Sequence, residues 1–338
     1  MELGLYTFGD LPLGGRSGDA GCKRLAEVVA AAKLADQAGL SVFGVGEHHR
    51  SDYAISAPAV VLGAIAAVTR DIRLTTAVTI LSSADPVRVF EDHATVDLLS
   101  SGRAELTVGR GAFMESFPLF GHALDDYEAL YDEKLGLLLD LFRTERVTWQ
   151  GRFRPALHKA EIAPRPVGTP ASAVRASRAG LPMNLANIGG EPARFAPFIE
   201  LYRRSGIAAG HDPSHLKVGI SSHLHVAKDA QRAREDFYPH YARYMGHNLP
   251  NRDQGWQVSR DDFEALASPR GALFVGSPQQ IVDKILYEHE LFGHQRFMAQ
   301  IDIGGLPFSK VATTIELLAA EVLPAVQRAT RGQVSEAA

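Results

Sequence analysis

The stretch that decides the fold is SVFGVGEHH, residues 41–49, an apolar run that ends in one carboxylate and two imidazoles. The run is short and follows Gly39, so it predicts a buried strand. Apolar residues recur with helical spacing before it, between Leu25 and Ala35, and a second apolar segment follows at 56–68. A buried strand between two helices is typical of an α/β fold in which right-handed crossovers join parallel strands.

The same alternation continues along the rest of the chain. Further strands are predicted at 2–8, 72–81, 104–109, 183–186, 216–226 and 296–303, and further helices at 86–99, 125–143, 171–179, 191–205, 228–245, 278–292 and 309–328. No change of composition marks a domain boundary, so we expect one (β/α)₈ TIM barrel domain over 1–330 and a disordered tail at 331–338. A doubly wound sheet would show the same alternation.

One segment, between the helices predicted at 125–143 and 171–179, departs from the pattern. It holds only a hairpin-like run at 147–153 and a proline-rich stretch at 163–166. Proline is a poor residue for an interior strand because it has no N–H to donate. We therefore count seven strands, and the fifth strand of the barrel is missing or atypical.

The composition excludes several classes of protein. Of 338 residues, 35 are basic and 39 acidic, and the net charge of −4 argues against general binding to nucleic acid or to an anionic membrane. No run is long enough for a membrane span, and no secretory signal is evident. The single cysteine, Cys22, excludes an intramolecular disulfide and a multi-thiolate metal site and favours a cytoplasmic location.

Several side chains that could carry chemistry lie where predicted strands end. In parallel α/β folds, functional groups gather at the carboxyl ends of the strands. Glu47, His48 and His49 follow the second strand, and Arg110 follows the fourth, where Gly109 allows a ligand to approach the backbone. Structural roles are the alternative, since Glu47 can accept hydrogen bonds from backbone amides and His49 can be solvated.

Three further residues meet the same positional criterion. His223 and His225 alternate on one predicted strand, and Asp302 lies near the end of the last one. Together with the histidines after the second strand they are ligand types for zinc, so a metal-dependent hydrolase is one hypothesis. Buried core histidines and a structural aspartate are the alternative, and the first predicted strand lacks the histidine pair that such hydrolases usually place there.

A second candidate site is the segment GTPAS, residues 168–172, which leads into a predicted helix. Thr169 suits the N-cap and Pro170 the first helical position. Free amides and the hydroxyls of Thr169 and Ser172 would suit a phosphate, although an ordinary capped helix explains them equally well. The chain shows no Walker-type loop, dinucleotide fingerprint or nucleophile elbow.

The ordered set of motifs resembles the bacterial luciferase-like family of flavin-dependent oxidoreductases. The resemblance spans nearly the whole chain and rests on GEHH at 46–49, IRLTTAV at 72–78, DPVR at 85–88, DLLSSGR at 97–103, VGRG at 108–111, FG at 120–121, GLPM at 180–183, AGHDP at 209–213, VGSP at 275–278 and IDIGG at 301–305. It implies a (β/α)₈ barrel that binds reduced FMN at the carboxyl ends of its strands. One departure is that Pro166 and Val167 lead directly into Gly168, where the family usually has an apolar fifth strand.

The resemblance also implies roles for individual residues. A cis non-prolyl peptide bond in a bulge against the flavin ring would join Ala77 to Val78, and Arg110, with Gly109, would contact the flavin. Thr169 and Ser172 would hold the FMN phosphate. The catalytic residues would be His48, acting as general acid and base, and Glu47.

By the same resemblance, the expected function is that of a two-component monooxygenase that uses reduced FMN and O₂ on an apolar small molecule through a flavin hydroperoxide. A separate reductase would supply the reduced FMN, because no nicotinamide fingerprint is present. The loops 110–122 and 247–270 would line the substrate pocket, and a homodimer is expected. A deazaflavin coenzyme used for hydride transfer, and a non-catalytic flavin binder, are the alternatives within the family.

Overall fold

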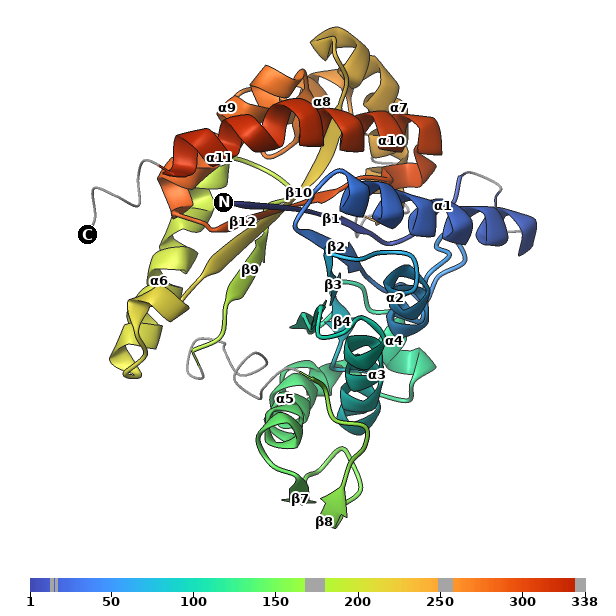
Figure 1. The fold of residues 1–338 in the computed structure, drawn as a ribbon, viewed down its shortest axis with the longest axis vertical. Helices are drawn as coiled ribbons and strands as arrows, with labels where there is room; N and C mark the ends of the chain where they lie inside the picture. Colours follow the sequence, from blue (N-terminus) through green and yellow to red (C-terminus); the bar gives the residue numbers. More distant parts are fainter. Residues whose placement is uncertain (13–14, 16–17, 168–179, 249–257, 332–338) are drawn as a thin grey trace.

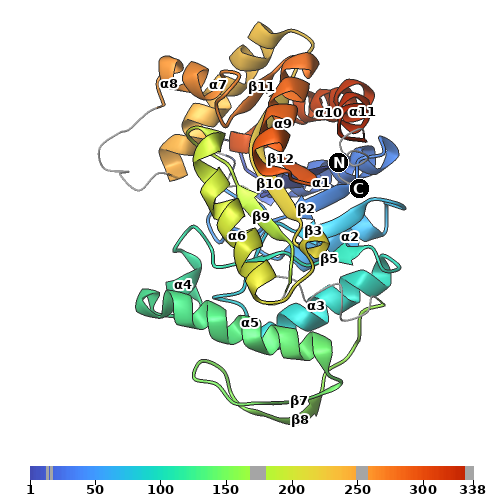
Figure 2. The same ribbon diagram turned by 90° about the vertical axis from the view of Figure 1, so that its left-hand side faces the viewer.

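The computed structural model describes residues 1–12, 15, 18–167, 180–248 and 258–331, and its centre is a parallel sheet of eight strands. The order is β11-β10-β12-β1-β2-β3-β5, and β9 also pairs with β10 (Figures 1 and 2). The strands are β1 (Glu2–Thr7), β2 (Val42–Val45), β3 (Arg73–Thr76), β5 (Ala104–Glu105), β9 (Met183–Ala186), β10 (Val218–Val226), β11 (Phe274–Gly276) and β12 (Arg296–Gln300).

Helices follow most of these strands and cover the outer face of the sheet (Figure 1). The α-helices are α1 (Gly18–Gln37), α2 (Pro58–Ala66), α3 (Pro86–Leu99), α4 (Ser116–Leu119), α5 (Tyr127–Arg143), α6 (Ala196–Ala208), α7 (Ala230–Asn248), α8 (Arg260–Leu266), α9 (Pro278–Phe292), α10 (Phe308–Leu317) and α11 (Leu323–Arg331). Short 3₁₀ turns lie at Leu124–Asp126, Pro192–Phe195, Pro213–His215 and Ile303–Gly305, and a π-helical turn, Leu318–Val322, joins α10 to α11.

Apart from β11, the strand neighbours in the described residues are those of a (β/α)₈ barrel without its fifth strand. The first and last strands, β1 and β12, pair with each other, so the sheet curls back toward its start. In the described part of the chain, β5 pairs only with β3, and β9 pairs only with β10. As predicted, the described residues from β6 to residue 167 contain no fifth barrel strand. The helix predicted at 171–179 lies outside the described residues.

Two strands predicted as continuous are each divided in two. The run 72–81 forms β3 and β4 (Thr79–Ile80), and the run 104–109 forms β5 and β6 (Val108–Gly109). Threonine side chains replace the backbone ladder at the break: Thr76 Oγ1 donates to Thr107 O at 2.6 Å and accepts from Thr107 N at 3.1 Å. Beyond the break, β4 pairs with β6.

The sequence analysis did not predict the short strand β11, and its other predictions differ from the structure mainly at the ends of elements. The hairpin predicted at 147–153 is longer, because β7 (Arg146–Trp149) pairs with β8 (Leu157–Glu161). The polar excursion at 247–270 contains α8, which begins at the N-cap Ser259. The second helix starts at Pro58 because proline, which has no N–H to donate, is suited to the first turn.

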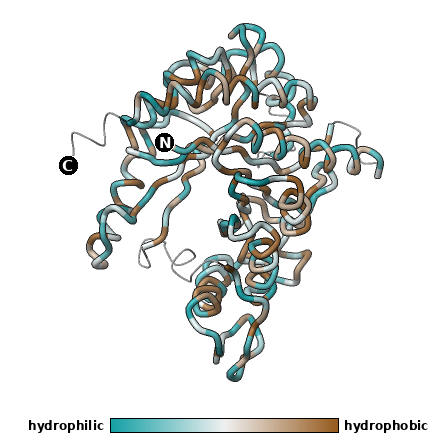
Figure 3. Tube along the Cα trace, viewed as in Figure 1, coloured by the Kyte–Doolittle hydropathy of each residue, from teal (hydrophilic) through white to brown (hydrophobic). Residues whose placement is uncertain are grey.

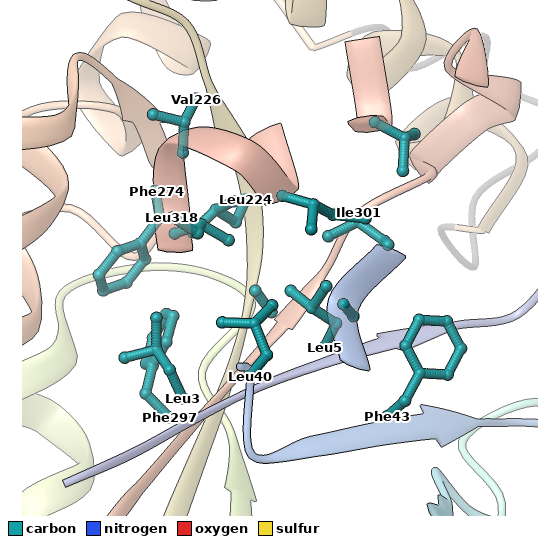
Figure 4. Packing of buried hydrophobic residues seen from close by; sticks show 14 of the residues in the cluster. Leu3, Leu5, Leu40, Phe43, Leu224, Val226, Phe274, Phe297, Ile301 and Leu318 are labelled. Atoms are coloured by element: carbon teal, nitrogen blue, oxygen red, sulfur yellow. The ribbon is translucent and has the colours of Figure 1, made fainter. Parts of the chain in front are cut away.

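The main hydrophobic core lies between the sheet and the helices. Leu3, Leu5, Phe43 and Phe297 lie in this layer and are almost completely buried (Figure 4). Hydrophobic and hydrophilic residues alternate along the helices, as expected where one helix face packs on a sheet (Figure 3). A smaller cluster lies between α3, α5 and β7. The described residues include no helix long and apolar enough to span a membrane.

Candidate active site

His48 lies directly after β2, inside a cluster of aromatic rings. Its ring centroid is 4.7 Å from that of Phe8, 4.2 Å from Tyr53 and 4.8 Å from Phe113. The side chain is buried, and its Nδ1 lies 3.2 Å from Oε1 of Glu115. Nε2 is buried as well and has no hydrogen-bond partner. One ring nitrogen is therefore committed to a carboxylate, and the other is left for a bound molecule.

Sequence reasoning missed Glu115, although it placed the loop 110–122 near the substrate. Burial acts to raise the pKa of Glu115, but the hydrogen bond from His48 and the charge of Arg50 hold it below its ordinary value. The only signal in the sequence is one acid beside the apolar Phe113, Met114 and Phe117. Phe117 itself is a core residue, fully buried and stacked on the ring of Tyr127.

Glu47 is aimed at the segment that follows β3. Its Oε1 accepts a hydrogen bond from the backbone N–H of Ile80 at 2.9 Å and lies 4.0 Å from Nε2 of His49. Burial raises the pKa of Glu47 to about 7, against the opposing effect of the Ile80 hydrogen bond. The hydrogen bond from Ile80 is the structural role given above as the alternative for Glu47. It ties the end of β2 to β4.

The peptide bond between Ala77 and Val78 is cis, as predicted. Two glycines make room for this bulge. A Cβ on Gly109 would lie 2.8 Å from Cγ2 of Val78, and a Cβ on Gly46 would overlap the carbonyl oxygen of Ala77. Both positions need glycine because the neighbouring strands approach so closely.

Arg110 lies at the same end of the sheet, immediately after β6. Its side chain is 49% exposed, and Nη1 donates to both carboxylate oxygens of Glu128, at 2.7 and 2.8 Å. The guanidinium carbon is 5.9 Å from the ring centroid of Tyr127 and 6.0 Å from that of Tyr131. The hydrogen bond to Glu128 raises the pKa of Arg110, so the side chain presents a permanent positive charge at the barrel mouth.

The proposed phosphate residues, Thr169 and Ser172, lie outside the described residues, as do residues 249–257 of the loop 247–270. The part of the site that the structure describes consists of the cis bulge, Gly109, Arg110 and the buried His48. These groups suit the ring system of a flavin, because they combine a close backbone approach, a cation and a dry imidazole at one end of the sheet.

The remaining histidine candidates are core residues. Burial lowers the pKa of His223 to about 3 and that of His225 to about 4. His225 Nδ1 lies 3.1 Å from Oγ1 of Thr314, and Asp302 accepts a hydrogen bond from Thr7 at 2.5 Å. No three histidine, cysteine or acidic side chains gather to hold a metal ion anywhere in the described ranges. The metal-dependent hydrolase hypothesis thus has no ligand cluster there.

A small pocket of about 90 Å³ lies beside the aromatic cluster. Tyr53 forms part of its wall and connects it to His48, because the two rings are in contact. The other walls come from the end of α7 and from the segments that follow β1 and β12, and they include Asp10, Arg243, Tyr244, Asn248 and Gly304. Of the two loops expected to line the substrate pocket, only His247 and Asn248 of 247–270 contribute to this lining among the described residues.

Comparison with known proteins identifies the family. The model of the luciferase-like monooxygenase family matches residues 1–295, and the chain belongs to this family. The oxygenase component of a flavin-dependent trigonelline monooxygenase from Acinetobacter baylyi is 23% identical, with 88% of this chain and 89% of the relative covered. An alkanal monooxygenase alpha chain from Photorhabdus laumondii is also 23% identical, over 88% of this chain and 91% of the relative.

Solved structures of the same fold extend the comparison. A monooxygenase from Streptomyces bottropensis has a TM-score of 0.82 and 26% identity, over 96% of this chain and 99% of that one. A coenzyme F420-dependent tetrahydromethanopterin reductase from Methanopyrus kandleri has a TM-score of 0.71 and 18% identity, over 96% of this chain and 98% of the other. These likenesses confirm the predicted luciferase-like barrel fold, and the family is one of flavin-dependent oxidoreductases.

Proposed function

We propose that this chain is the oxygenase component of a two-component monooxygenase that uses reduced FMN and O₂. The observation that carries the proposal is the placement of His48, the closely packed Ala77–Val78 segment and Arg110 at one end of the sheet. The flavin-dependent oxygenase component among its relatives supports the two-component assignment. The reduced flavin, when bound, supplies the activation of O₂.

The residues of this chain would bind, orient and shield the flavin. The backbone of Ala77, Val78 and Gly109 would lie against the flavin ring, and Arg110 would balance its negative charge. Thr169 and Ser172 remain our proposal for the phosphate. This division of roles matches the half-exposed guanidinium of Arg110 and the close packing around the bulge.

His48 is proposed as the general acid and base, working through Nε2. An imidazole exchanges protons near neutral pH, and the surrounding rings of Phe8, Tyr53 and Phe113 exclude water from it. We assign Glu47 a positioning role in catalysis, because its carboxylate holds Ile80, two residues beyond the cis bond.

We propose a small, largely apolar substrate that reaches His48 past the loop 110–122. A separate flavin reductase would supply the reduced FMN, and the single, exposed Cys22 fits a reducing, cytoplasmic setting. A homodimer is proposed through α2 and α3, where Val60 is 74% and Leu99 61% exposed.

A deazaflavin-dependent hydride transfer is the second candidate, because coenzyme F420-dependent enzymes share the fold. Titrating the protein with FMN, reduced FMN and the deazaflavin, followed by fluorescence and absorbance, separates the two. We expect reduced FMN to bind most tightly, and His48→Gln to lower oxygen-dependent turnover about 10²–10⁴-fold while leaving flavin binding intact. Preference for the deazaflavin would move the function to hydride transfer, and flavin binding without any turnover would leave a flavin-binding protein.

A further inference from the structure

We propose that Glu115 is the positioning residue of His48, holding the imidazole with its proton on Nδ1 so that Nε2 offers a lone pair to the reacting molecule. The inference rests on the proposed function for its purpose, but the pairing itself is a property of the free protein. Nothing in the family's motifs along this chain marks Glu115, which lies 67 residues beyond His48.

The geometry restricts His48 to one arrangement. Oε1 of Glu115 lies 3.2 Å from Nδ1, and an ionised carboxylate can only accept, so Nδ1 must carry the proton. The backbone N–H of His48 donates to Ile55 O at 3.0 Å, which anchors the residue. The rings of Phe8, Tyr53 and Phe113 enclose the imidazole and keep it from turning over.

The charges around the pair favour an ionised Glu115. The charge of Arg50 acts to lower the pKa of Glu115, and its guanidinium carbon lies 5.4 Å from the ring centroid of Tyr53 and 5.6 Å from that of Phe113. Arg50 is itself bound to the carboxylate of Asp52, so it does not replace His48 as the hydrogen-bond partner of Glu115. The other titratable groups facing the pair are His49, which interacts with both His48 and Glu115, and Tyr53, whose ring contacts that of His48.

The same arrangement separates the two nitrogens by function. Nδ1 is tied to the carboxylate, whereas Nε2 is buried without a partner among the aromatic rings. A carboxylate at this distance stabilises the protonated imidazole by charge and fixes the tautomer of the neutral one. Glu115 thereby keeps the lone pair of the neutral imidazole on Nε2, at the position where a proton must move.

The test reads the tautomer of His48 directly, in cofactor-free protein. Histidine labelled with ¹⁵N is observed by long-range proton–nitrogen correlation NMR, and the His48 signals are identified by their loss in His48→Gln. The variants are Glu115→Gln, which keeps the shape and removes the charge, and Glu115→Asp, which keeps the charge. Glu161→Gln is the charge-matched control, because Glu161 lies on the β7–β8 hairpin and is 65% exposed.

We expect the wild-type protein and the control to show neutral His48 with its proton on Nδ1. In Glu115→Gln, the pH midpoint for protonating His48 should fall by at least one unit, a tenfold change or more, and Glu115→Asp should lie closer to the wild type. A proton on Nε2 in the wild type, or the same midpoint in Glu115→Gln, would overturn the proposal. The wild-type tautomer decides the question even if a variant fails to fold.

Turnover measurements then test whether the Glu115–His48 pair acts in the reaction. Glu115→Gln should shift the acidic limb of the pH profile of kcat to lower pH and reduce kcat, with the KM for the substrate nearly unchanged. A purely structural role for Glu115 would instead reduce activity equally at every pH, and would count against the proposal. If the wild-type protein itself shows no flavin-dependent turnover, the proposed function fails, while the tautomer measurement still stands on its own.

Discussion

Single residues at the barrel mouth combine burial with very few polar contacts. His48 and Glu47 are neighbours in the chain, yet their side chains point to different partners, Glu115 and the backbone of Ile80. Each is removed from water, so each depends on its one partner far more than an exposed side chain would. This dependence makes both residues sensitive to conservative substitutions.

Glu47 should make the stability of the protein fall as pH rises. Its pKa is raised to about 7 in the folded state, so between about pH 4.5 and 7 the folded protein binds a proton that the unfolded chain has released. The free energy of unfolding therefore decreases through this window. Glu47→Gln keeps an acceptor for Ile80 but has no charge. Between pH 5 and 8, its free energy of unfolding should therefore fall by about 1–3 kcal/mol less than that of the wild type.

Denaturant unfolding at pH 5, 6, 7 and 8 measures this slope for the wild type and for Glu47→Gln. Glu161→Gln, at the exposed hairpin, is the control and should follow the wild type. Parallel curves for the wild type and Glu47→Gln would show that Glu47 is already ionised in the folded protein.

Gly46 should not tolerate even one methyl group. A Cβ there would overlap Ala77 O, a backbone atom held by the strands on both sides, so Gly46→Ala should cost about 1–3 kcal/mol of stability. Gly21→Ala is the matched control, since its Cβ would meet nothing within 4 Å and alanine favours the helix α1 by about 0.5–1 kcal/mol. Thermal unfolding of both variants tests this, and equal stability of Gly46→Ala and the wild type would contradict the close approach.

At the scale of elements, side-chain contacts hold the strands together in addition to the backbone hydrogen bonds between them. Across the break after β3, the threonines 75 and 76 bond to Thr107, and at the opposite end of the barrel Arg73 and Arg296 join β1, β3, β5 and β12. The sequence predicted the strands themselves well, because apolar runs are a local signal. It did not predict the breaks, because a threonine that replaces a ladder bond looks like any other strand residue.

Arg296 should stabilise the amino-terminal end of the barrel. Its guanidinium donates to Glu2 at 2.7 Å and to Glu105 at 2.6 Å, and all three side chains are partly buried. Although burial acts to raise it, the neighbouring arginines hold the pKa of Glu2 below its ordinary value. Arg296→Ala should therefore cost about 1–3 kcal/mol, discounted for solvent screening.

The control for this variant is Arg146→Ala on the β7–β8 hairpin. Arg146 pairs with Glu161 at 2.5 Å, but their side chains are 70% and 65% exposed, so the loss should be below about 1 kcal/mol. Urea unfolding at one salt concentration measures the loss of stability in Arg296→Ala and in Arg146→Ala. Equal losses would mean that the network under the barrel contributes no more than a surface ion pair.

At the scale of the whole molecule, the barrel leaves apolar side chains exposed on α2 and α3. Val60, Leu98 and Leu99 are 74%, 46% and 61% exposed, and we propose this apolar surface as the dimer interface. We expect the wild type to be a dimer by light scattering after size-exclusion chromatography. The double variant Val60→Asp, Leu99→Asp should be monomeric, and Ile207→Asp on α6 should remain dimeric. A monomeric wild type, or loss of the dimer only in Ile207→Asp, would contradict this interface.

The alternation of strands and helices and the gap before residue 168 follow from local patterns in the sequence itself. The barrel class and the position of the cis bond were implied by the resemblance of its short motifs to the luciferase-like family. Only the tertiary structure decided that Glu115 faces His48, that Glu47 holds Ile80, and that His223 and His225 are core residues. The physical reason is that burial and pairing across 67 residues depend on where the barrel brings loops together, and no local pattern encodes that distance.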